Sequence, residues 1–153
     1  MHKMYIIVVI LSLLLLSGCG KVSEPLSARE RIENSVALPS GAWYTDVAQV
    51  WEREFLSESL RPFFFGEETP DYSWVLYLGA ESDTLCEILY AVCHTEREAR
   101  ALAAHLSARI ETLKREAEGR YAEALGDATV ERRGKSVLYT CTEENGRVLA
   151  LLR

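Results

Sequence analysis

The chain has 153 residues, with 17 basic and 23 acidic side chains that give a formal net charge of −6. This acidic balance argues against nucleic-acid binding and against direct adsorption to anionic lipid, because both need a basic surface. Once an N-terminal export segment is set aside, the remaining length suits one small domain around a single hydrophobic core.

Residues 1–18 have the three parts of an export signal: a basic start at Lys3, an apolar stretch over 4–16 and small residues before a cleavage point. The apolar stretch is shorter than the span of about 20 residues that a transmembrane helix needs. A transmembrane anchor with a chance cysteine is the alternative, which the polar sequence after the stretch disfavours. The run from Leu16 to Cys19 reads LSGC, in which small side chains fit a lipoprotein signal peptidase and the thiol accepts a diacylglycerol. We predict a lipoprotein signal peptide over 1–18 and a lipid anchor on Cys19, at the extracytoplasmic face of the cell membrane.

Residues 19–42 contain two prolines, glycines and several charged residues, with little apolar periodicity. This composition predicts a flexible tether with a reach of roughly 25 Å by random-coil scaling. Within this tether, residues around 26–36 could form a frayed helical turn. The folded domain is then expected over 43–153.

The first half of the domain predicts a helix and then a hairpin. Apolar side chains recur at steps of three and four over 43–60, which is the pattern of an amphipathic helix. The three phenylalanines at 63–65 follow, and they form either an exposed patch or, as we favour, a buried plug under a loop. Aromatic and branched residues over 73–78 and 85–94, with turn-forming residues between them, predict two antiparallel strands.

The strongest helix signal comes after this hairpin. Thr95 is suited to cap the helix, and Glu98 at the third helical position completes a capping box. Apolar residues then recur at steps of three and four from Ala99 to Tyr121. We expect this helix to end near Gly126.

The last part of the chain predicts two or three strands, over 128–133, 136–142 and 147–152. Asn145 followed by Gly146 indicates a tight hairpin turn, since both residues tolerate positive φ. The element order is typical of an α+β domain. We predict two layers: one antiparallel sheet of four to five strands, with the long helix and the N-terminal helix packed on one face.

Several segments resemble one known family. They are the LSGC run, WYTDV at the start of the domain, the strand LCEILYAV, the helix ending RIETLKREAEGRYAEAL and the closing GKSVLYTCTEENG. Together they resemble a bacterial lipoprotein family catalogued as domain of unknown function forty-three fifty-eight. The resemblance covers nearly the whole mature domain, and it implies the same fold and location without assigning catalytic residues. Family members tend to have a proline-containing segment after the long helix, whereas Tyr121 is followed here by Ala122, Glu123 and Ala124.

Glu87 is the acidic residue of most interest, because it interrupts the apolar strand over 85–92. One interpretation is a structural ion pair with Arg109 or Arg132 on the open side of the sheet, and this is the one that we favour. The other is a desolvated carboxylate with a raised pKa in a ligand-binding cleft.

Cys86, Cys93 and Cys141 remain once Cys19 is assigned to the lipid. The first two differ by an odd number of strand positions and point to opposite faces, so they cannot pair locally. A disulfide between Cys93 and Cys141 stays open, although we favour three small buried thiols. Cys141 near His94 across strands is a conceivable nucleophilic pair that we do not expect to be catalytic. No CxxC spacing exists, and we predict neither a metal site nor a cofactor.

Taken together, these features predict a non-enzymatic, lipid-anchored module that binds an envelope protein, a peptide or a cell-wall component. Besides Glu87, the candidate binding residues are Trp74, Tyr77 and Tyr139, which we expect on the open face and one end of the sheet. The alternative is a small-ligand or metal carrier that serves a membrane transporter, which requires a concave pocket with a few convergent polar groups.

Overall fold

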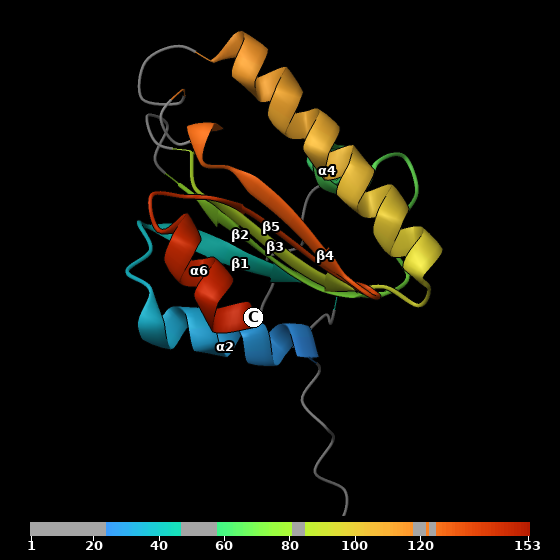
Figure 1. Ribbon diagram of the computed structural model, residues 1–153, viewed down its shortest axis with the longest axis horizontal. Coiled ribbons are helices and arrows are strands. Elements are labelled where there is room, and N and C mark those ends of the chain that lie inside the picture. Colours follow the sequence, from blue (N-terminus) through green and yellow to red (C-terminus); the bar gives the residue numbers. More distant parts are fainter. Residues whose placement is uncertain (1–23, 47–57, 81–84, 118–121, 123–124) are drawn as a thin grey trace, which may run out of the picture.

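A computed structural model describes residues 24–46, 58–80, 85–117, 122 and 125–153. Within these ranges the chain forms a five-stranded antiparallel sheet in the order β1-β2-β3-β5-β4 (Figure 1). The strands are β1 Gly41–Thr45, β2 Ser73–Gly79, β3 Glu87–Val92, β4 Thr129–Arg133 and β5 Ser136–Cys141. The helices within these ranges include α2 Glu24–Ser35, α3 Arg61–Phe65, α4 Glu96–Glu116 and α6 Asn145–Leu152. The predicted α+β fold with an antiparallel sheet is therefore confirmed.

Helices cover both faces of this sheet, whereas we expected them on one. Figure 1 shows α4 on one side, with α2 and α6 on the other. Each side has its own hydrophobic core: Leu76 and Leu89 belong to the α4 side, while Val75 and Ile88 belong to the α2 side. The reason lies in the central strand β3, which is buried at its first five positions and therefore needs cover on both faces.

The long helix α4 begins as predicted. The Thr95 hydroxyl accepts a hydrogen bond from the Glu98 amide at 3.2 Å, and the Glu98 carboxylate accepts one from the Thr95 amide at 2.9 Å. Its buried stripe consists of Ala99, Leu102, Leu106 and Ile110. The helix ends at Glu116 with Ala117 as its C-cap, earlier than expected. Residues 118–121 lie outside the described part of the chain.

The segment expected to be a tether contains the regular helix α2. Pro25 lies in its first turn, where proline is tolerated, and Ala28 and Ile32 are spaced to share one face. All three are buried, and the helix packs against β2, β3 and α6. The helical turn considered around 26–36 is therefore a regular, packed helix, and from Glu24 to the sheet the chain is not the flexible tether that we predicted.

The helix predicted over 43–60 is wrong at its start. Trp43, Tyr44 and Thr45 belong to β1, where Trp43 lies opposite Tyr77 of β2. Aromatic and branched side chains favour this pleated, half-buried setting. Residues 47–57 lie outside the described ranges. After them, the phenylalanine triplet forms α3, in which Phe64 and Phe65 are buried and Phe63 is 55% exposed.

The hairpin predicted at Asn145 and Gly146 is also wrong, because α6 begins there. The Asn145 side-chain oxygen accepts hydrogen bonds from the Thr140 hydroxyl and the Thr142 amide, both at 2.8 Å. Its amide nitrogen donates to the Asp127 carbonyl at 2.8 Å. This buried network holds the end of β5 against the start of α6, so the strand expected over 147–152 is a helix.

Candidate functional site

Glu87 lies in a buried polar cluster beneath α4. The Arg109 guanidinium, projecting from α4, donates through Nη2 to Glu87 Oε1 at 2.8 Å and through Nε to Oε2 at 3.4 Å. The Tyr139 hydroxyl on β5 donates to Glu87 Oε2 at 2.5 Å. The ion pair with Arg109 that we favoured is therefore present, but it lies under a helix and not on an open face.

The surroundings of this cluster stabilise its charged pair. Burial disfavours the charged guanidinium, but the adjacent Glu87 carboxylate outweighs it, so the pKa of Arg109 is raised. Burial, with the Glu87 charge adding to it, raises the pKa of Tyr139. The Tyr139 hydroxyl therefore stays protonated and donates a hydrogen bond to the carboxylate. The Arg109 guanidinium also lies over the rings of Phe64 and Phe63, at 4.6 and 5.6 Å from their centroids. Both carboxylate oxygens of Glu87 are thus held by internal donors.

The three aromatic residues predicted to form a binding surface are buried. Trp74 is 6% exposed, Tyr77 4% and Tyr139 0%. Trp74 and Tyr139 belong to the core under α4, where Trp74 packs on Phe65, whereas Tyr77 belongs to the opposite core. The prediction of an exposed aromatic surface is wrong, because both faces of the sheet are covered and these rings fill the space beneath the helices.

The three described cysteines are buried, and no disulfide joins them. Burial raises the pKa of Cys86 and of Cys93 to about 11 and that of Cys141 to about 12. Cys141 lies opposite Glu87, at the start of β3, whereas Cys93 and His94 follow the end of that strand. His94 contacts the Asp71 carbonyl at 3.1 Å. The strand thus separates Cys141 from His94, and the conceivable nucleophilic pair does not form.

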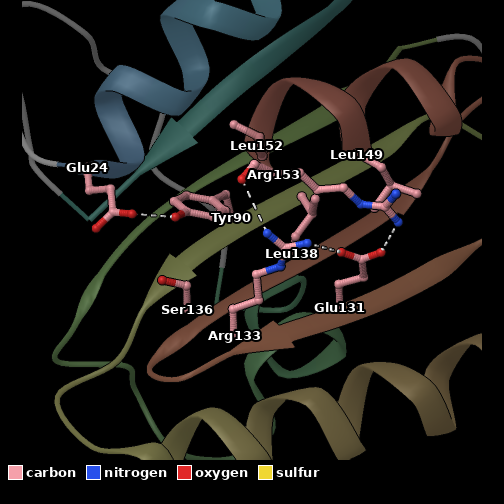
Figure 2. A pocket seen from close by; sticks show the side chains of 9 residues that line it. All are labelled: Glu24, Tyr90, Glu131, Arg133, Ser136, Leu138, Leu149, Leu152 and Arg153. Atoms are coloured by element: carbon pink, nitrogen blue, oxygen red, sulfur yellow. Dashed lines mark hydrogen bonds and ion pairs between the residues drawn. The ribbon is translucent and has the colours of Figure 1, made fainter.

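A pocket of about 190 Å³ lies on the opposite side of the sheet from α4. Its lining comes from five elements, as Figure 2 shows: Glu24, Tyr90, Glu131, Arg133, Ser136, Leu138, Leu149, Leu152 and Arg153. The leucines, two of them from α6, supply apolar surface. The Tyr90 hydroxyl donates to the Glu24 carboxylate at 2.7 Å at one end of the pocket.

The other end of the pocket is a cluster of charged side chains around Glu131. Arg153 Nη2 donates to Glu131 Oε1 at 2.5 Å, and Arg133 Nη2 lies 3.8 Å from Oε2. The hydrogen bond from Arg153 holds the pKa of Glu131 below its usual value. Arg133 and Arg153 have 57% and 55% of their side chains exposed, so they present positive charge to solvent.

Sequence reasoning did not find this pocket. Glu131 and Arg133 are two positions apart on one strand and therefore share a face, which was a usable signal. The contribution of Arg153 could not be seen, because the segment before it reads as a strand and folds as α6. Glu24 was hidden for a similar reason, since it lies in the segment expected to be a tether.

Comparisons with protein-family models, with curated proteins and with solved structures found no match. The resemblance to the lipoprotein family therefore depends on the sequence segments quoted for it. Among the residues that the structure describes, no helix combines the length and the apolar character needed to cross a membrane. Within those same ranges, no group of three or more His, Cys, Asp or Glu side chains is placed to hold a metal ion.

Proposed function

We propose that this chain is a lipid-anchored protein of the extracytoplasmic face of a bacterial cell membrane, and that its folded domain is a binding module. The observation that carries the proposal is the LSGC run ending at Cys19, after a short apolar segment and a basic start. A diacylglycerol on that cysteine supplies the two acyl chains that hold a protein stably on a bilayer.

The position of α2 supports a domain held close to the membrane. Cys19 and Glu24 are five positions apart, which bounds the distance between them to at most about 18 Å in a fully extended chain. Because α2 packs on the sheet, its start cannot move away from the domain without losing the buried contacts of Ala28 and Ile32. The side of the domain that carries Glu24 would therefore face the bilayer.

The chemistry of the buried groups supports binding over catalysis. Glu87 is held by Arg109 and Tyr139, and the thiols of Cys86 and Cys141 have pKa values well above neutral pH. These groups are satisfied inside the protein or protonated at neutral pH. A concave site with a few convergent polar groups exists instead in the pocket beside α2 and α6, which is the usual form of a ligand site.

That pocket also favours a second candidate function, a small-ligand carrier that delivers its cargo to a membrane transporter. The two functions differ in their partner. A carrier should be cross-linked to an integral membrane protein in native membranes, in a manner that depends on Arg133 or Arg153 beside the pocket. A module that binds a cell-wall component or peptide should be captured on that component without a transporter.

The anchor is tested by expressing the full chain and its Cys19→Ser variant in a bacterium that processes lipoproteins. The mature wild-type protein should start at Cys19, carry the mass of a diacylglycerol and sediment with membranes after alkaline washing. The Cys19→Ser chain should lack the added mass and keep its signal segment, while Ser23→Ala should behave as wild type. An unmodified Cys19 in the wild-type protein would refute the anchor.

A further inference from the structure

We propose that the pocket beside α2 and α6 binds a phosphate ester that carries an apolar substituent. This chemistry is shared by the headgroup region of a phospholipid and by free phosphate esters. The inference deepens the proposed function and depends on it for one step, the placement of the pocket next to the bilayer. Its other steps come from the charges, donors and apolar surface of the pocket itself.

The first step is the local charge. Arg133 and Arg153 line the pocket, and Arg31 reaches the same region through a hydrogen bond from Nη1 to the Leu151 carbonyl at 3.3 Å. Against these arginines stand the carboxylates of Glu24 and Glu131. The two arginines and two glutamates that line the pocket balance to zero, and Arg31, outside the lining, adds one positive charge beside it, on a protein whose formal charge is −6. An anion is therefore repelled less at this pocket than at the average surface of the protein.

The second step is the supply of hydrogen-bond donors. A guanidinium has five N–H donors in a planar fork that matches phosphate oxygens. One N–H group of Arg153 donates to Glu131 at 2.5 Å, and one N–H group of Arg133 donates to the Arg153 carbonyl at 3.3 Å. Both heads are more than half exposed, so they have N–H groups facing solvent. The Ser136 hydroxyl on the pocket wall is already hydrogen-bonded to Tyr90, so the donors for an anion come from the two arginines.

The third step is the apolar wall. Leu138 comes from β5, and Leu149 and Leu152 come from α6, as Figure 2 shows. An inorganic anion would gain nothing from these side chains, whereas an ester with a hydrocarbon group would bury it against them. The pocket volume of about 190 Å³ is below the roughly 300 Å³ at which pockets for drug-sized ligands begin. The pocket thus accepts a phosphate and the first carbons of its substituent, and not a whole lipid.

The fourth step is the position of the pocket relative to the membrane, which follows from Glu24. Glu24 lines the pocket and lies within about 18 Å of Cys19 along the chain. If Cys19 is acylated, the pocket opens near the level of lipid headgroups. The lipid source of the phosphate ester is therefore at hand at a high local concentration.

The test measures binding to the full chain in a phosphate-free, non-ionic detergent by ³¹P chemical-shift titration. The probes are dihexanoylphosphatidylglycerol and glycerol 3-phosphate, with dihexanoylglycerol as a competitor that lacks phosphate. We expect saturable binding of the first probe, weakened about tenfold or more by Arg133→Gln or Arg153→Gln, since each removes charge-assisted hydrogen bonds. Arg100→Gln is the matched control, because Arg100 lies exposed on α4 across the sheet. It should change the affinity less than about twofold.

The probes separate the two sources. Tighter binding of dihexanoylphosphatidylglycerol than of glycerol 3-phosphate assigns the site to lipid, whereas equal affinity would show that the apolar wall contributes nothing and would overturn the apolar part of the proposal. The proposal is overturned if no probe shows saturable binding, if dihexanoylglycerol competes as well as its phosphate ester, or if Arg100→Gln weakens binding as much as Arg133→Gln. Thermal melts of all variants verify that they are folded. This titration does not need an acylated cysteine, so its outcome and that of the Cys19→Ser experiment are read independently.

Discussion

The charged side chains are buried on one face of the sheet and exposed on the other. Under α4, the side chains of Glu87 and Arg109 are only 8% and 14% exposed, and they satisfy each other with the help of Tyr139. Across the sheet, Arg133 and Arg153 are more than half exposed around a Glu131 that is 26% exposed. The first cluster is closed to solvent, and the second borders a pocket.

This difference teaches which charges are available for function. A buried ion pair has lost its hydration, and it is tolerated only because each partner replaces the water of the other. Exchanging one partner for a ligand would leave a charge unpaired. An exposed pair is weak, because water competes with it. The arginines beside Glu131 can therefore take a new anion at little cost, and the following variants test this contrast.

The largest effect is expected from Arg109→Ala. It leaves Glu87 buried without its cation, which should lower the free energy of unfolding by about 3–5 kcal/mol. Urea denaturation measures this as a lower midpoint at unchanged slope. Arg100→Ala on the same helix is the control, because its ion pair with Glu96 is exposed and should contribute less than about 1 kcal/mol. Equal losses of stability in the two variants would mean that the buried ion pair contributes no more than an exposed one.

Asn145→Ala should come next, with a loss of about 1–3 kcal/mol. The variant leaves the Thr142 amide and the Asp127 carbonyl without their partner at the junction of β5 and α6. Thermal and urea unfolding both report it.

Gly146→Ala is the informative companion of that variant. Space around Gly146 is open, and its φ is not positive. In a helix the alanine should therefore raise stability by about 0.4–1 kcal/mol. A loss of stability would favour a hairpin turn at this position and contradict α6.

The buried thiols give an effect on stability that appears only at high pH. Burial raises the pKa of Cys86 from 9.0 to about 11. The unfolded chain loses this proton first, so the folded state binds more protons between these values and stability falls as the pH rises from about 9 to about 11. The slope contributed by Cys86 is at most about 1.4 kcal/mol per pH unit. Urea midpoints at pH 8, 9 and 10 should fall less steeply for Cys86→Ala, and identical slopes would contradict the raised pKa.

The smallest effect on stability is expected from Arg133→Gln. The side chain is exposed, so the free energy of unfolding should change by less than about 0.5 kcal/mol, although binding of dihexanoylphosphatidylglycerol falls. Urea unfolding and the ³¹P titration on the same preparation give both values. A stability loss close to that of Arg109→Ala would contradict the view that the exposed arginines are not needed for folding.

Much of the fold could be predicted because local signals agreed with it. The capping box of Thr95 and Glu98, the apolar stripe of α4 and the strand patterns around β2, β3, β4 and β5 needed no tertiary information. The cover on both faces was also readable, since β3 is almost continuously apolar and such a strand needs helices on both sides. An acidic residue in such a strand predicted an ion pair of Glu87 with Arg109 or Arg132, and the structure shows that the partner is Arg109.

The remaining errors come from tertiary contacts that outweigh local patterns. Asn145 and Gly146 favour a turn by themselves, but the Asn145 side chain bonds to Thr140 and Thr142 and starts α6 instead. The short stripe of Ala28 and Ile32 forms a stable helix only because the sheet is there to bury it. The pocket depends on both of these helices, and so it could not be predicted before they were known.

The strand order has a consequence for how the chain folds. The pairs β2 with β3 and β4 with β5 are neighbours in the chain, whereas the central pairing of β3 with β5 closes a loop over residues 93–135. Closing such a loop costs entropy before its contacts form, so we expect two hairpin halves to appear early and to join late. The hydrogen bond between Tyr139 and Glu87 crosses this seam. It is formed only when the halves meet, which makes loss of the Tyr139 hydroxyl a probe of whether that meeting is the slow step in folding.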